Sequence, residues 1–176
     1  MKNHILVYGI GTGTIMSILS ILAGLNKESI AINFILQLAV FGVLFTGLLF
    51  GIIAHRKTYY NDSARFGQAY HWGTQILLFA VLTQATISLI YFNLDTNAMQ
   101  SVAEETERNI EMYEMDDEQA DAIRKFNAIF ISPGGIVAAT ICCFGTIGLI
   151  LNLIAAKIAE KENHLSHKED IKHENE

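Results

Sequence analysis

The stretch SIAINFILQLAVFGVLFTGLLFGIIA, residues 29–54, holds no Asp, Glu, Lys, Arg or His. About 20 apolar residues are enough for a helix to cross the hydrocarbon of a bilayer. A backbone in lipid must satisfy its own hydrogen bonds, which a helix does. Three further intervals lack Asp, Glu, Lys and Arg: Ile5 to Leu25, Phe66 to Leu94 and Phe126 to Ala156. We therefore expect an all-α integral membrane four-helix bundle in residues 1–158, with spans at about 5–25, 31–54, 73–93 and 133–156.

The charged residues are few and unevenly placed. Hydrophobic residues make up 51% of the chain and charged residues 17%, against roughly 25% charged residues in typical soluble domains. Residues 94–128 hold ten acidic and three basic residues, which gives this segment a formal charge of −7, whereas the whole chain has −6 and its remainder is about neutral. This acidity argues against a nucleic-acid partner, because its phosphates would be repelled. The expected surroundings are membrane lipids.

The acidic loop, residues 94–128, is too long for a simple turn. Ile123, Phe126 and Phe130 recur at helical spacing in its C-terminal part, which predicts an amphipathic helical segment that leads into the fourth span. Pro133 follows Ser132, so it either starts the fourth span behind a serine cap or kinks a longer helix. Residues 159–176 form a charged tail that we expect to be disordered.

Lysine and arginine near the span ends predict the orientation of a membrane protein. Arg56, Lys57 and Arg65 lie between the second and third spans. The acidic loop has basic residues of its own, Arg124 and Lys125, near the fourth span. The balance favours both termini in the cytoplasm. We expect a multi-pass protein of the inner membrane of a bacterium, with the acidic loop outside.

Small residues recur four apart within the spans, which places both members of a pair on one face of a helix. The pairs are Gly9 and Gly13, Gly47 and Gly51, and Gly135 and Ala139. Such pairs let helix backbones approach closely. They predict a compact bundle and leave a homo-oligomer open.

The loop between the second and third spans is the best candidate for specific contacts. Asp62 or Ser63 could cap a helix over Ala64 to Tyr70 that continues into the third span. We expect this region to touch lipid headgroups or a protein partner. The candidate contact residues are Arg56, Lys57, Arg65, Phe66 and Gln68. The aromatic residues beside the loop are typical of rings that collect at headgroup level, and they are Tyr59, Tyr60, Tyr70 and Trp72.

No enzyme motif, metal site or ion relay stands out. The interiors of the spans lack the ionisable groups that mark proton relays and ion coupling. The amides that remain in the spans would bond helices together or, alternatively, line a path for a neutral solute, and they are Gln37, Gln75, Gln84 and Asn152. His164 and His167 in the tail are too few ligands for a transition-metal site. We expect no catalytic residue, no cofactor and no metal.

Several segments together resemble a known family. The second span closes on Gly51-Ile52-Ile53-Ala54-His55-Arg56, and the third opens on Phe66-Gly67-Gln68-Ala69 and Gly73. An acidic segment before the last span reads Glu111-Met112-Tyr113-Glu114-Met115. Over most of residues 1–158 the chain resembles the bacterial membrane family catalogued as domain of unknown function 4199. The spacer Asp62-Ser63-Ala64-Arg65 lacks the glycine that this family often has there. The resemblance implies four spans and no activity.

These observations favour a non-enzymatic membrane component that acts by contacting proteins or lipids. The basis is the lack of reactive groups in the spans beside two polar loops. The rival is a channel or carrier for a small neutral solute, which would use the amides and hydroxyls within the spans.

Overall fold

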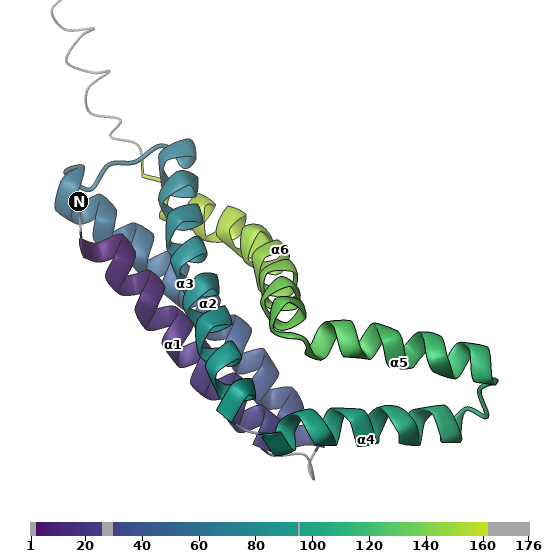
Figure 1. The fold of residues 1–176 in the computed structure, drawn as a ribbon. Coiled ribbons are helices and arrows are strands. Elements are labelled where there is room, and N and C mark those ends of the chain that lie inside the picture. Colours follow the sequence, from purple (N-terminus) through teal and green to yellow (C-terminus); the bar gives the residue numbers. More distant parts are fainter. Residues whose placement is uncertain (1–2, 26–29, 95, 162–176) are drawn as a thin grey trace, which may run out of the picture.

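A computed structural model describes residues 3–25, 30–94 and 96–161, which form six helices. Four of these helices are long and apolar enough to cross a membrane: α1 (Asn3–Leu25), α2 (Ile30–Tyr59), α3 (Phe66–Leu94) and α6 (Pro133–Ala159). Between α3 and α6 the acidic loop forms two shorter helices, α4 (Thr96–Met112) and α5 (Asp117–Ile131) (Figure 1). The expected all-α four-span architecture is therefore confirmed, and the acidic loop holds a pair of helices.

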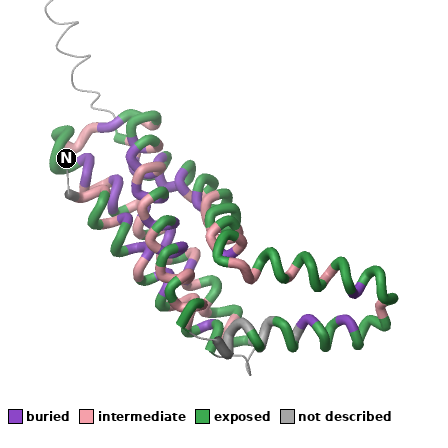
Figure 2. Tube along the Cα trace, in the orientation of Figure 1, coloured by how far each residue is buried: buried purple, intermediate pink, exposed green. Residues whose placement is uncertain are grey.

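Helix α3 is the centre of the bundle. It packs against α1, α2 and α6, while α2 also contacts α1 and α6. The buried side chains lie where these helices meet, and the outer faces are exposed (Figure 2). Met16, Leu48 and Ile76 are fully buried, whereas Phe34 and Leu78 on the outer faces are more than half exposed. Large exposed apolar side chains on every side of a bundle match a lipid environment.

The paired glycines of α1 and α2 lie at contacts inside the chain. A Cβ atom added to Gly13 would lie 2.4 Å from the carbonyl oxygen of Ala80 in α3. One added to Gly47 would lie 2.1 Å from the hydroxyl oxygen of Thr12 in α1. Gly9 and Gly51 are enclosed in the same way, since Phe79 of α3 lies next to Gly9 and Ile76 of α3 lies next to Gly51. Helices approach this closely only where the side chain is a hydrogen atom.

The connection between α5 and α6 is a fixed elbow at Ser132. Helix α5 ends at Ile131, and Ser132 caps the next helix because its Oγ accepts a hydrogen bond from the Gly135 amide at 3.1 Å. Pro133 is the first residue of α6, where its missing N–H is harmless. It starts the fourth span, which decides between the two alternatives left open by the sequence. Gly135 faces the Ile129 carbonyl oxygen so closely that a Cβ atom would lie 1.9 Å from it.

The start of α3 differs from the expected one. The sequence predicted a helix from Ala64, but the helix begins at Phe66. The reason is a tertiary contact, since Ala64 pairs through its backbone with Lys161 at the end of α6. The amide of Arg65 is satisfied by the side chain of Gln68, at 3.1 Å. Beyond this start, α3 continues without interruption into the third span, as predicted.

Two buried amides join the spans. Asn152 of α6 donates to the backbone oxygen of Tyr70 at 3.0 Å and to the hydroxyl of Thr74 at 3.1 Å, both in α3. Gln84 of α3 donates to the hydroxyl of Ser20 in α1 at 3.3 Å. These bonds between helices are the structural role that the sequence favoured for such amides. The Asn152 Oδ1 atom lies against Gly73, where an added Cβ would be only 1.8 Å away.

Replacing Gly73 with alanine should weaken the α3–α6 contact, because the new methyl group would collide with Asn152. We expect Gly73→Ala to lower the free energy of unfolding by about 1–3 kcal/mol, the usual effect of overpacking. The matched control is Gly67→Ala on the same helix, where nothing lies within 4 Å and no loss is expected. Thermal unfolding of the purified protein in mild detergent measures both. In an Asn152→Ala background the Gly73→Ala penalty should shrink; an unchanged penalty would contradict this explanation.

Candidate functional site

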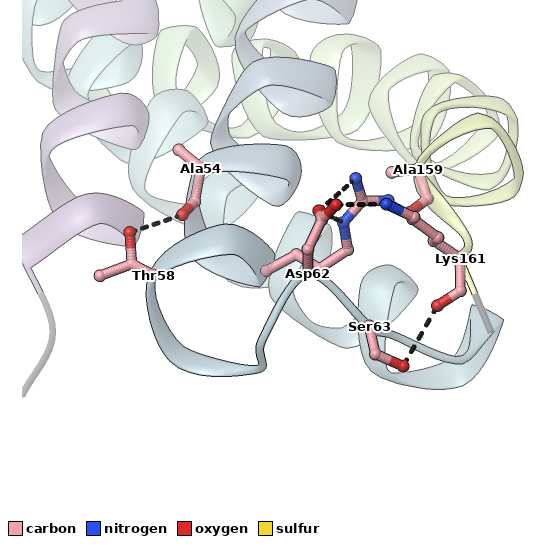
Figure 3. A network of polar contacts seen from close by, with 7 residues as sticks. Ala54, Thr58, Asp62, Ser63, Ala159 and Lys161 are labelled. Atoms are coloured by element: carbon pink, nitrogen blue, oxygen red, sulfur yellow. Dashed lines mark hydrogen bonds and ion pairs between the residues drawn. The ribbon is translucent and has the colours of Figure 1, made fainter. Parts of the chain in front are cut away.

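Arg56, Asp62 and Lys161 form a polar cluster, called here the clasp, at the end of the bundle where the described chain begins and ends. The Arg56 guanidinium contacts the Asp62 carboxylate through Nη2 at 2.8 Å and through Nε at 2.9 Å. Its Nη1 atom donates to the backbone oxygen of Ala159, and Lys161 pairs with the other Asp62 oxygen. Figure 3 shows Asp62 beside Lys161, with Ser63 directed at the Lys161 backbone. The clasp ties the α2–α3 loop to the end of α6.

The backbone reinforces these charged contacts. The Ala64 amide donates to the Lys161 carbonyl at 2.8 Å, and the Lys161 amide donates back at 3.0 Å. Asn61 and Asp62 have positive φ angles of 48° and 60°, a conformation that Asn and Asp adopt more readily than most residues. The turn therefore brings the Asp62 carboxylate back toward Arg56. Sequence periodicity carries no signal for a contact between residues so far apart in the chain.

Arg56 was a candidate for contact with lipid headgroups or a protein partner, and in the structure its guanidinium is engaged inside the molecule. The residue is 8% exposed. A buried guanidinium needs a partner, since an unpaired charge there would be strongly destabilising. Of the other candidate contact residues, Phe66 is half-buried and stacks on Tyr70, with 6.1 Å between ring centroids. The remaining candidates, Lys57, Arg65 and Gln68, are exposed.

A cavity of about 400 Å³ lies next to the clasp, between α1, the end of α2 and the start of α3. Its size falls within the range of small-molecule sites, about 300–1,000 Å³. Apolar side chains form one part of its wall, and imidazole, phenol, indole and amide groups form the other. The lining residues are Ile5, Leu6, His55, Tyr60, His71, Trp72, Gln75 and Phe79.

The polar part of the cavity is held by its neighbours. Trp72 is 5% exposed and packs against Tyr60 and His55, with ring centroids 4.6 and 4.8 Å away. It was expected among rings at headgroup level, and in the structure its indole is covered by these two rings. One turn apart on α3, the Gln75 Nε2 and the His71 Nε2 lie 2.9 Å apart. The amide must donate here, so the neutral form of His71 has its proton on Nδ1.

The chemistry of the lining is that of hydrogen bonding without fixed charge. The lining contains no Asp, Glu, Lys or Arg. In the described part of the chain, no group of three or more His, Cys, Asp or Glu could hold a metal ion. The tail histidines, His164 and His167, lie outside the described residues. The cavity therefore suits a ligand with an uncharged, hydrogen-bonding head and an apolar body.

Sequence reasoning missed this cavity, although a signal for it exists. The residues were interpreted singly, as interface anchors or helix bonds. Taken together, His55 lies near the end of α2 and Tyr60 is the first residue of the α2–α3 loop, whereas His71, Trp72 and Gln75 follow that loop. Because the loop is short, side chains that flank it on two antiparallel helices must meet. A cluster of aromatic and imidazole side chains around one short loop therefore predicts a shared site.

The clasp should open in acid. Hydrogen bonding from Lys161, aided by Arg56, holds the pKa of Asp62 below its ordinary value. A carboxylate with a lowered pKa stabilises the fold above its unfolded pKa, and this stabilisation is lost as the pH falls through the folded pKa. We therefore expect protection of the Ala64 amide from hydrogen exchange at neutral pH, with loss as the pH falls through the lowered pKa of Asp62.

The variant Asp62→Asn should lose that protection at neutral pH as well. The matched control is Asp121→Asn, which removes a carboxylate from the exposed ion pair with Lys125 on α5 and should leave Ala64 protected. Protection factors corrected for the intrinsic exchange rate make the comparison. Equal protection in the wild-type protein and in Asp62→Asn would contradict the clasp as the origin of the effect.

Comparison with known proteins places the chain in one family. The sequence profile described as Protein of unknown function (DUF4199) matches residues 7–161. No curated protein and no solved structure matches the chain. The matched range begins within α1 and takes in the rest of that span, the other three spans, the acidic helices and the clasp. The chain belongs to the DUF4199 family.

Proposed function

We propose that this chain is a non-enzymatic component of a bacterial inner membrane that binds a lipid-like amphiphile in the cavity beside the clasp. The two ends of the chain lie in the cytoplasm in this proposal, so the cavity opens at the cytoplasmic face. The observation that carries it is a cavity of about 400 Å³ with a hydrogen-bonding part and an apolar part, located where the spans end.

The depth of the cavity supports a membrane ligand. It is lined by residues near the end of α2 and the beginning of α3, next to the polar loop that joins them. Headgroups and the first carbons of lipid chains occupy this level of a bilayer. Leu6 lines the cavity and is 42% exposed on the outer side of α1. A hydrocarbon chain in the bilayer therefore has a path to the apolar wall from the side.

The lining also supports a particular kind of head. A phosphate or a carboxylate would call for lysine or arginine in contact with it, and the lining has neither. His71 and Gln75 present one hydrogen-bonded pair, and Tyr60 adds a phenol. An uncharged head with hydroxyl or carbonyl groups, such as that of a diacylglycerol, fits this set. Exposed Lys57 and Arg65 nearby would attract the anionic lipids that surround the site.

The rival function, a path for a small neutral solute, has less support. Gln84 and Asn152 are engaged in bonds between helices, and neither lines the cavity. Gln37 is exposed on α2. Solute flux in proteoliposomes that disappears in Gln37→Leu would favour the rival over amphiphile binding.

Filling the cavity should remove amphiphile binding. In Leu6→Trp the indole would occupy the apolar wall, while in the matched control Val7→Trp it would lie on an exposed position of the same helix outside the lining. A photoactivatable diacylglycerol should label the start of α1 and residues 71–79 in the wild-type protein and in Val7→Trp. Leu6→Trp should lose this label.

Two further results test the proposal. His71→Ala should weaken binding by about 2- to 10-fold, the range for one neutral hydrogen bond. A photoactivatable phosphatidylglycerol should label the same residues less than diacylglycerol does. Equal labelling of Leu6→Trp and Val7→Trp, or stronger labelling by the anionic probe, would contradict an uncharged amphiphile in this cavity.

A further inference from the structure

The α4–α5 hairpin leaves the bundle sideways, at the end of the spans that is opposite to the clasp (Figure 1). It is highly exposed, with few buried residues (Figure 2). Within the described residues α4 packs against α3 and α5, and α5 packs against α4 and α6. The hairpin thus extends from the bundle without lying along the spans. This feature is separate from the cavity and from the function proposed for it.

One face of α5 is an exposed apolar stripe. Phe126, Ile129 and Phe130 are 59%, 64% and 45% exposed. Their spacing places them on the same side of the helix, and the ring centroids of Phe126 and Phe130 lie 4.6 Å apart. At the tip of the hairpin Met112 and Tyr113 are also exposed. Three large apolar side chains on one helix face form a surface that is unfavourable in water and marks a contact with a protein or with lipid.

The polar groups of α5 are turned to other sides. Arg124 makes two bonds of 2.8 Å with Glu107 of α4, and Asn127 donates to Thr106 of α4 at 2.6 Å. These contacts define the side of α5 that faces α4. Lys125 pairs with Asp121 at 2.9 Å on a third, exposed side. The charged side chains of α5 named here therefore either pair with α4 or face water, and the stripe contains none.

The elbow fixes the direction of this stripe relative to the spans. Ser132 follows the last residue of α5 and caps α6, and a Cβ atom added at Gly135 would lie 1.9 Å from the Ile129 carbonyl oxygen and 2.8 Å from the Phe130 Cα. The stripe begins directly before this elbow. After the elbow, the exposed residues Pro133, Gly134 and Ala138 carry no charge, and large exposed apolar side chains resume at Ile141. No Asp, Glu, Lys or Arg lies between Phe126 and Ala156, so the uncharged interval of α6 extends through the elbow to the stripe.

We propose that the α4–α5 hairpin lies in the lipid interface at this end of the spans, with Phe126, Ile129 and Phe130 against acyl chains and its carboxylates toward water. Helices with one apolar face and one strongly charged face bind bilayers in this manner. Lipid is the occupant because the stripe and the exposed apolar side chains of α6 belong to one uncharged interval, residues 126–156, that is joined by the elbow. The acidic character of the hairpin would be repelled by anionic headgroups, so apolar contact supplies the attraction.

Spin labels test which surface covers the stripe. Cys142 and Cys143 are first replaced with alanine, since both are exposed and would react. Single variants Phe126→Cys and Phe130→Cys then carry a nitroxide on the stripe, and Asp117→Cys and Asp121→Cys carry it on the charged side of the same helix. The full-length protein is reconstituted in phosphatidylcholine vesicles. Collision rates with oxygen, which partitions into lipid, and with a nickel chelate, which stays in water, give the depth of each label.

The labels on the stripe should show high oxygen and low nickel accessibility, and those on the charged side the reverse. Added phosphatidylglycerol should leave the stripe labels at the same depth or shallower. Equal nickel accessibility at the four positions would overturn the proposal in favour of a solvated hairpin. Low accessibility of the stripe labels to both reagents would overturn it in favour of a protein or a second copy as the cover. A depth that requires phosphatidylglycerol would also overturn it.

Discussion

Hydrocarbon offers no partner for a peptide group, and this constraint governs the rest of the molecule. Each of the four long segments closes its own backbone hydrogen bonds as a helix. With no water to expel between the helices, their association depends on close contact and on a few polar bonds. Gly13, Gly47 and Gly73 let backbones or short side chains approach, and Asn152 and Gln84 tie α6 and α1 to α3. The central position of α3 follows, because it takes part in both amide contacts.

The sequence predicted what depends on local composition. The four spans and the helical character of the acidic loop follow from charge-free intervals and from the spacing of Ile123, Phe126 and Phe130. It could not predict what depends on distant pairs. Nothing near Arg56 in the sequence indicates that it meets the backbone of Ala159, so it was assigned to the surface. The same limit explains Ala64, whose pairing with Lys161 delays the start of α3.

The burial of individual side chains is the second property that the sequence pattern could not predict. Trp72 lies near the end of a span, where indoles often face headgroups. Whether it does so depends on neighbours from other segments, here His55 of α2 and Tyr60 of the α2–α3 loop, which cover it. The cavity has the same origin, since its polar and apolar parts come from three different helices. A span prediction treats each helix alone. It therefore identifies the helices that line such a site but not the fact that their side chains surround a common cavity.

The clasp also gives the molecule a mechanical connection. Asp62 is held by Arg56 and Lys161, and only one residue separates it from Tyr60 in the cavity wall. Lys161 lies near the start of the charged tail, and residues 162–176 follow it. A protein that bound the tail and drew Lys161 away would therefore remove one of the two partners of Asp62 and loosen the turn that carries Tyr60. By reciprocity, an occupied cavity that held Tyr60 in place would resist that pull. Displacement of the tail and occupation of the cavity would then have opposite effects on the same short loop.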